Sequence, residues 1–297
     1  MDNGYVISCE STADLSDEHF RERGVIYTCF TFTIDGQDLK DDYGKSMDIH
    51  EFYARMKAGS MTSTSQVSTA EYEDLWRPYL ADGKDIFHLT LSTGISGTYN
   101  SACVAAEELK EEFPGRKIEV IDSLNASSGF GLLVDMACDK RDEGASLEEL
   151  RAYMLSIRNN CNAWFFTNDL TYLFRGGRLS KTAFVLGTAL KVCPLLRINS
   201  EGRLLPSAKL RGTKKVIEAC AKKMEERAEG GLSYNGYCYI SHSEALEETE
   251  ELRSLIEARF KNLRGGGVRT FDIGTVIGSH TGPGTVALFF MGTEKEL

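Results

Sequence analysis

Hydroxyl side chains gather in a short loop at residues 92–98, between an apolar run rich in strand-forming residues and a stretch with apolar residues at helical spacing. The loop contains Ser92, Thr93, Ser96 and Thr98 together with Gly94 and Gly97. A helix N-terminus that presents hydroxyls and backbone N–H groups attracts negative charge, so this loop could bind an anion. The same hydroxyls could instead only cap the helix, because serine and threonine are common helix caps.

Two further hydroxyl clusters and one histidine could serve the same purpose. Residues 10–14 follow the first expected strand, residues 62–65 read TSTS, and His280 lies in a glycine-rich stretch at residues 278–285. We expect this last stretch to be a loop in which His280 donates a hydrogen bond to an anion. A histidine that merely fills a tight turn is the alternative.

The same residues also permit a hydrolytic interpretation. Residues 94–98 read GISGT, which nearly matches the G-x-S-x-G turn of α/β-hydrolases but ends on Thr98. The chain order of Ser96, Asp122 and His280 is that of a hydrolase triad. A serine hydrolase or acyltransferase therefore stays open as the alternative function.

Composition and charge exclude several other classes. The 297-residue chain has a net charge of −10 and a pI near 5.2, which disfavours nucleic acid and anionic membrane surfaces. No phosphate-binding loop ends in GK[ST], and the eight cysteines lack zinc-type spacing, so we expect no metal and no cofactor. We expect a cytoplasmic protein, because no apolar stretch is long enough for a membrane span.

The expected elements place the hydroxyl clusters together. Strands and helices alternate over residues 5–160, which predicts a three-layer domain at 1–160 with a mainly parallel sheet and helices on both faces. Ligands bind beyond the carboxyl ends of such strands, where the hydroxyl loops lie. Residues 161–297 predict a second, α+β domain with a mixed sheet.

Several local predictions accompany this division. The β-branched and aromatic run at residues 25–34 predicts one strand, which the turn Asp35-Gly36 joins to an antiparallel partner. Ser180 is expected to cap a helix whose apolar residues, at 184–190, could wall a ligand cavity. Lys209, Arg211 and the lysines at 214–215 form a basic segment that could be a docking site.

Several stretches, in order along nearly the whole chain, resemble motifs of the DegV family, whose characterised members are bacterial fatty-acid-binding proteins of the FakB type. Residues 10–15 resemble its D-S-T-x-D-L motif, residues 64–68 its T-S-Q-P-S, and residues 91–102 its L-S-S-x-L-S-G-T-Y-x-S-A. Residues 172–180 (YLFRGGRLS), 191–194, 209–212 and 280–284 (HTGPG) follow in the family's order.

This resemblance implies a ligand and a set of residues that bind it. In the family, a threonine and a serine that match Thr64 and Ser96 hold the fatty-acid carboxylate, His280 matches a histidine of the same network, and the acyl chain lies between the domains. We expect Ser65 and Gly97 to assist in binding the carboxylate. We expect four further residues to lie outside direct contact with the carboxylate, where they support the site or contact a kinase. These residues are Ser11, Thr12, Arg178 and Arg211.

The resemblance also implies a partner, a separate ATP-dependent fatty acid kinase with a dihydroxyacetone-kinase-like ATP domain, which would convert the bound acid to an acyl phosphate. The chain itself is then expected to be a lipid carrier and not an enzyme. Glu10 replaces the usual aspartate and Val67 the usual proline. We expect the first change to alter a supporting hydrogen bond and the second to loosen the loop that aims Thr64.

A third hypothesis is a regulatory or interaction protein that uses the basic segment around Arg211.

Overall fold

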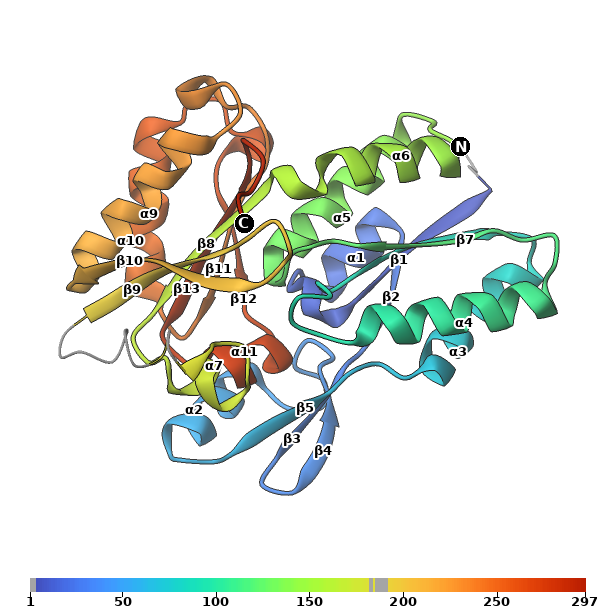
Figure 1. Cartoon of the computed structure of the whole chain (residues 1–297), viewed down its shortest axis with the longest axis horizontal. Helices are drawn as coiled ribbons and strands as arrows, with labels where there is room; N and C mark the ends of the chain where they lie inside the picture. Colours follow the sequence, from blue (N-terminus) through green and yellow to red (C-terminus); the bar gives the residue numbers. More distant parts are fainter. Residues whose placement is uncertain (1–3, 182–183, 185–191) are drawn as a thin grey trace.

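The computed structural model describes residues 4–181, 184 and 192–297, and its strands form three sheets, which we call A, B and C (Figure 1). No helix among these residues combines the length and the apolar character that crossing a bilayer requires. The expected class, an α/β protein with a parallel sheet followed by a mixed sheet, is confirmed. The division into domains at residue 160 stays a prediction.

Sheet A is a parallel sheet with the strand order β2-β1-β6-β7. Its strands are short apolar runs, β1 (Tyr5–Glu10), β2 (Val25–Thr28), β6 (Asp85–Thr90) and β7 (Ile118–Asp122). Helices α5 (Ser127–Asp142) and α6 (Leu147–Ile157) lie on one side of the sheet, and α3 (Thr69–Ala81) and α4 (Thr98–Glu112) lie on the other (Figure 1). Helix α1 (Asp17–Arg23) packs beside β2. The polar loops therefore follow strands whose carboxyl ends meet at one edge.

Sheet B is a small antiparallel sheet with the order β4-β3-β5. Its strands are β3 (Thr31–Ile34), β4 (Gln37–Lys40) and β5 (Thr62–Ser65), and α2 (Ile49–Lys57) precedes β5. Asp35 and Gly36 both have positive φ, 51° and 77°, as a two-residue hairpin turn requires. The prediction of one strand over residues 25–34 is wrong, because the chain leaves sheet A after Thr28 and starts sheet B at Thr31.

Sheet C is a mixed sheet with the order β10-β9-β8-β13-β11-β12, in which only β11 and β12 pair in parallel. Its strands are β8 (Cys161–Thr167), β9 (Val192–Ile198), β10 (Leu204–Arg211), β11 (Cys238–Ser243), β12 (Arg269–Asp272) and β13 (Thr285–Met291). Helices α9 (Thr213–Arg227) and α10 (Leu246–Arg259) pack on one face, and α5 contacts β8, β11 and β13. Helix α5 therefore lies between sheets A and C.

Two short helices complete the surroundings of the site, α7 (Thr171–Arg175) and α11 (Thr275–Thr281), which contact each other. Short 3₁₀ turns occur at Ser11–Ala13, Arg158–Asn160, Gly231–Ser233 and Arg264–Gly266. The stretch around His280 is thus the end of a helix and not the loop that the glycines predicted. The helix expected after Ser180 and its apolar residues at 184–190 fall mostly outside the described residues.

The helix N-termini show which serine and threonine hydroxyls act as caps and which do not. Ser68 and Ser146 each form a reciprocal capping box with a glutamate three residues later, as serine followed by glutamate predicts. Helix α4 begins differently, because its N-cap is Gly97 and no side chain caps it. Neither Ser96 nor Thr98 is therefore the N-cap residue of α4, although the Ser96 hydroxyl accepts a long hydrogen bond, 3.3 Å, from the backbone N–H of Thr98.

Candidate functional site

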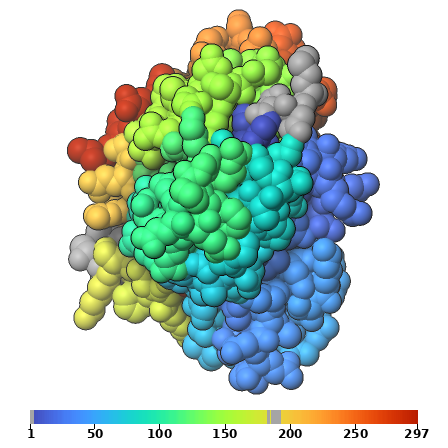
Figure 2. All heavy atoms as spheres, turned by 90° about the vertical axis from the view of Figure 1, so that its right-hand side faces the viewer, coloured from blue at the N-terminus to red at the C-terminus, as the bar shows by residue number. Residues whose placement is uncertain are grey.

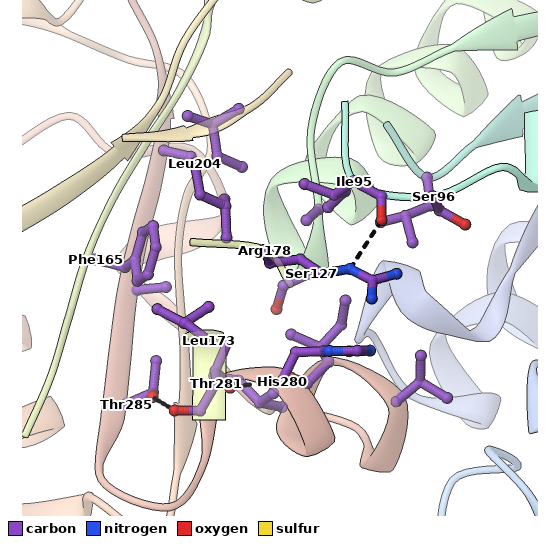
Figure 3. A pocket seen from close by; sticks show the side chains of 18 of the residues that line it. Ile95, Ser96, Ser127, Phe165, Leu173, Arg178, Leu204, His280, Thr281 and Thr285 are labelled. Carbon is purple, nitrogen blue, oxygen red and sulfur yellow. Dashed lines mark hydrogen bonds between the residues drawn. The ribbon is translucent and has the colours of Figure 1, made fainter. Parts of the chain in front are cut away.

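A cavity lies between sheet C, the polar loops of sheet A, and helices α7 and α11. Its volume is about 180 Å³. Figure 3 shows Phe165 and Leu204 at one end of the cavity. Ser96 and His280 lie at the other end, and the Arg178 side chain extends between these two residues. The cavity is lined by Phe30, Thr64, Gln66, Leu91, Ile95, Ser96, Gly97, Ala126, Ser127, Ala163, Phe165, Leu173, Arg178, Ile198, Leu204, Ile273, Val276, Ile277, His280, Thr281, Thr285, Ala287 and Phe289.

Sheet C supplies the apolar wall. Side chains alternate between the two faces of a strand, so residues two apart share a face. Ala163 and Phe165 of β8 face the cavity together with Ala287 and Phe289 of β13. Each of these four side chains is at most 6% exposed. This wall offers no charged group to a ligand.

Four side chains, Thr64, Ser96, Arg178 and His280, form what we call the polar end of the cavity. Thr64 Oγ1 and His280 Nε2 are 2.8 Å apart and hydrogen-bonded, which joins β5 to the last turn of α11. The other ring nitrogen, Nδ1, is buried and has no hydrogen-bond partner among the described residues. The imidazole packs closely on Gly176, where a Cβ atom would lie 2.2 Å from Nδ1.

Arg178 places a positive charge at the polar end. Its Nε donates to the carbonyl oxygen of Ile95 at 3.0 Å, and its guanidinium donates to that of Gly176 at 2.6 Å (Figure 3 shows the bond to Ile95). No carboxylate of the described residues forms an ion pair with Arg178. Burial lowers the pKa of Arg178, and burial together with this cation lowers the pKa of His280 to about 4. The polar end is therefore positively charged and lacks an internal counterion.

Ser96 and Gly97 line the cavity from the loop that precedes α4. The Ser96 hydroxyl accepts only a long hydrogen bond, 3.3 Å, from the backbone N–H of Thr98. Its hydroxyl proton is thus available to a ligand.

Glu10, which stands where the family motif has aspartate, supports this loop through hydrogen bonds. Its buried carboxylate accepts from the backbone N–H of Leu91 at 2.7 Å and from the Tyr72 hydroxyl at 2.6 Å. Tyr72 in turn is hydrogen-bonded to Thr98 at 2.6 Å. Glu10 therefore holds both ends of the loop. Val67 is fully buried in the core, so packing fixes the position where the family pattern has proline.

Asp41 and Asp14 hold helix α11 in place, and sequence reasoning missed their role. Asp41 accepts from the backbone N–H and the hydroxyl of Thr275, at 2.9 and 2.7 Å. Asp14 accepts from the backbone N–H of Gly274 at 3.0 Å. Both carboxyls are buried, and burial raises the pKa of each. The cluster at residues 10–14 contained a sequence signal for Asp14, whereas Asp41 lay in no motif that the sequence singled out.

The remaining residues that the sequence singled out lie away from the cavity. Ser65 is exposed, because it points to the opposite face of β5 from Thr64, and strand alternation could have predicted this. Ser11 donates to Asp41 at 2.9 Å and so supports α11 indirectly. The Thr12 hydroxyl is buried without a partner among the described residues. Arg211 is exposed at the far end of β10 from Leu204.

The residues of the hydrolase interpretation do not assemble into a triad. Asp122 accepts hydrogen bonds from Thr93 and from the backbone N–H of Leu124. His280 is bonded to Thr64, and none of the hydrogen bonds of the described residues joins it to Ser96 or to Asp122. Ser96 also lacks the positive φ that a strained nucleophile turn would give it. Over these same described residues, no three histidine, cysteine or acidic side chains cluster as metal ligands would.

Fold and cavity together define a class of α/β proteins in which a parallel sheet and a mixed six-stranded sheet flank an apolar cavity with a polar end. A family model described as "Uncharacterised protein, DegV family" matches residues 5–293, and the chain belongs to the DegV family.

Relatives and solved structures match the chain over almost its full length. A DegV domain-containing protein of Clostridium perfringens is 33% identical over 292 residues, which cover 98% of this chain and 99% of the relative. The structure of a DegV family protein from Thermus thermophilus, described as binding fatty acid, superposes with a TM-score of 0.84 at 29% identity and covers 97% of this chain and 99% of its own. A Thermotoga maritima protein, described as revealing a fatty acid binding function, gives 0.81 at 27% identity and covers 98% and 99%.

Proposed function

We propose that this protein binds one long-chain fatty acid, with the acyl chain in the cavity and the carboxylate at the polar end. The observation that carries the proposal is a half-buried cation, Arg178, at one end of a cavity whose other end is apolar. Fatty acid binding by the Thermus and Thermotoga family members supports the same ligand.

The energetics favour an amphiphile with a single acid group. An acyl chain of roughly sixteen carbons gains ~0.8 kcal/mol for each buried methylene, and the ordering of the chain offsets part of this gain. Transfer of a carboxylate from water into the protein costs several kcal/mol of free energy unless the carboxylate receives charge-assisted hydrogen bonds there. The guanidinium of Arg178, which has no carboxylate partner among the described residues, and the Ser96 hydroxyl supply such donors.

We assign direct contact with the carboxylate to Thr64, Ser96, Arg178 and His280, with Gly97 offering its backbone N–H. Neutral His280 can donate one hydrogen bond through whichever nitrogen carries its proton. Ser65 is left out because it points away from the cavity. Glu10 and Asp41 act by positioning, since they hold the Ser96 loop and helix α11.

We further propose that the protein presents its ligand to a separate fatty acid kinase in the cytoplasm. A surface groove of about 680 Å³ borders the polar end and shares Ser96, Gly97 and Arg178 with the cavity. Through this groove a kinase could transfer the γ-phosphoryl group of ATP to a carboxylate oxygen, which would release ADP and leave an acyl phosphate. The groove contains a further cation, Arg203, and lies at the end of β10 opposite to Arg211. The kinase-contact role of Arg211 therefore requires an interface that extends along β10.

Mass spectrometry of lipid extracted from the purified protein tests the binding proposal. We expect a fatty acid at up to one equivalent, and a rise in melting temperature when delipidated protein receives long-chain acid. If no fatty acid copurifies and added acids leave the melting temperature unchanged, the proposal is wrong. A fluorophosphonate probe tests the hydrolase alternative, and we expect no label on Ser96.

A further inference from the structure

A second cavity lies on the opposite face of sheet C from the acyl cavity. Asn162 and Trp164 of β8 line it, whereas their neighbours Ala163 and Phe165 line the acyl cavity. Its volume is about 330 Å³. The lining residues are Asn162, Trp164, Arg197, Ile198, Pro206, Ser207, Lys223, Arg227, Lys295 and Glu296.

Positive charge dominates this second cavity. Four cations, Arg197, Lys223, Arg227 and Lys295, line it with a single carboxylate, Glu296. The side chain of Glu296 is 73% exposed and forms an ion pair of 2.9 Å with Arg227, whose side chain is 17% exposed. An exposed carboxylate contributes little free energy as a partner, so a more highly charged anion can displace it.

Two of the four cations are paired with exposed carboxylates, and two donate to main-chain oxygens. Lys223 forms an ion pair of 2.7 Å with Glu226, whose side chain is 41% exposed, and Arg227 donates to Asn162 and to the carbonyl oxygen of Glu294 as well as to Glu296. Arg197 donates to the carbonyl oxygen of Glu296 at 2.9 Å and to a main-chain oxygen of Leu297 at 2.6 Å. Lys295 is 5% exposed, and its ammonium donates one hydrogen bond, of 2.6 Å, to the carbonyl oxygen of Leu124. An ammonium has three donors, so two find no partner among the hydrogen bonds of the described residues. Burial lowers the pKa of Lys295 to about 8, as expected for a cation without a full counterion.

We propose that this cavity is a second binding site, for a small molecule that carries one or more phosphate groups. Two guanidinium groups can donate to phosphate oxygens once these replace their present, exposed partners, and two ammonium groups add charge that a monoanion could not balance. The Lys223 ammonium lies 5.3 Å from the ring centre of Trp164, which holds this cation beside the cavity. The site lies on the other face of sheet C from the acyl cavity, although Ile198 lines both, and the proposal does not depend on fatty acid binding.

Calorimetric titration of the full chain with inorganic pyrophosphate, at 150 mM salt, tests the site. We expect saturable binding of one equivalent. Lys223→Gln and Arg197→Gln should each weaken this binding at least tenfold. Lys222→Gln is the matched control, because Lys222 belongs to the same helix, α9, carries the same charge and does not line the cavity. It should change the affinity less than twofold.

Three outcomes would overturn the proposal. Pyrophosphate could fail to bind at millimolar concentration, Lys222→Gln could weaken binding as much as Lys223→Gln, or both cavity variants could bind as tightly as the unchanged protein. Equal loss in the control would indicate diffuse attraction to the basic surface. Melting curves of all three variants verify that each is folded, and the result does not bear on the acyl cavity.

Discussion

Thr64 and His280 are separated by 216 positions in the chain, and their side chains meet in a hydrogen bond of 2.8 Å at the polar end of the cavity. Thr64 lies on β5 of sheet B, whereas His280 lies on α11, just before the strand β13 of sheet C. The contact therefore joins two parts of the fold at the place where a ligand carboxylate would sit. Its replacement offers the most direct test of the proposed site.

Thr64→Val should weaken fatty acid binding, while the protein stays folded with a lower free energy of unfolding. The change keeps the shape of the side chain, but it removes the hydroxyl and leaves His280 Nε2 without a partner, at a cost of about 1–3 kcal/mol. We expect a five- to hundredfold rise in the dissociation constant, measured by displacement of a fluorescent fatty acid. Ser65→Ala is the control, since Ser65 is the exposed neighbour on β5. Equal affinities for the two variants would contradict the assignment of Thr64.

Arg178→Gln should separate recognition of the acid group from recognition of the chain. The guanidinium is the only cation among the residues described as lining the acyl cavity, apart from a protonated His280. Its loss should weaken binding of palmitate at least tenfold and change binding of the uncharged hexadecanol less than threefold. Calorimetry with the two ligands makes the comparison. A similar loss for both ligands would show that Arg178 shapes the cavity and does not bind the charge.

Gly176→Ala should displace the imidazole of His280 without straining the backbone. Gly176 has φ −71° and ψ −5°, a conformation open to any residue, yet a Cβ atom there would lie 2.2 Å from His280 Nδ1. We expect fatty acid affinity to fall about tenfold. We also expect overpacking to lower the free energy of unfolding by roughly 1–3 kcal/mol. The double variant Gly176→Ala, His280→Ala removes the clash. Its stability should therefore exceed what the two single changes predict when added.

His280 should make the unliganded protein lose stability as the pH falls from about 6.5 to about 4. Its pKa is about 4 in the folded protein, against an ordinary value of 6.5. Within this window the unfolded chain binds a proton that the folded protein does not, so acid favours unfolding, by at most about 3 kcal/mol. Urea titrations at several pH values measure the effect.

The comparison for this pH effect is His280→Gln, which should lose less stability than the unchanged protein over the same window. His50→Gln should retain the loss, because the exposed His50 beside Glu244 has a raised pKa and acts in the opposite direction. Identical pH profiles for His280→Gln and the unchanged protein would show that His280 titrates normally.

The sequence by itself determined the features that depend on neighbouring residues. The Asp35-Gly36 turn, the capping boxes at Ser68 and Ser146, and the short apolar strands of sheet A all follow from local backbone preference and from burial at a regular period. The hydroxyls of Thr64 and Ser96 stood out for a related reason, since they sit in stretches that local structure does not fully explain.

The tertiary structure alone decided which of those residues share a cavity. Thr64 faces it and Ser65 does not because the chain leaves sheet A after Thr28 and builds sheet B, whose register orients β5. Arg178 becomes part of the polar end through its bond to Ile95, and His280 through α11, which Asp41 anchors. These contacts span tens to hundreds of residues, so they depend on how the sheets pack, and no short-range pattern in the chain encodes that packing.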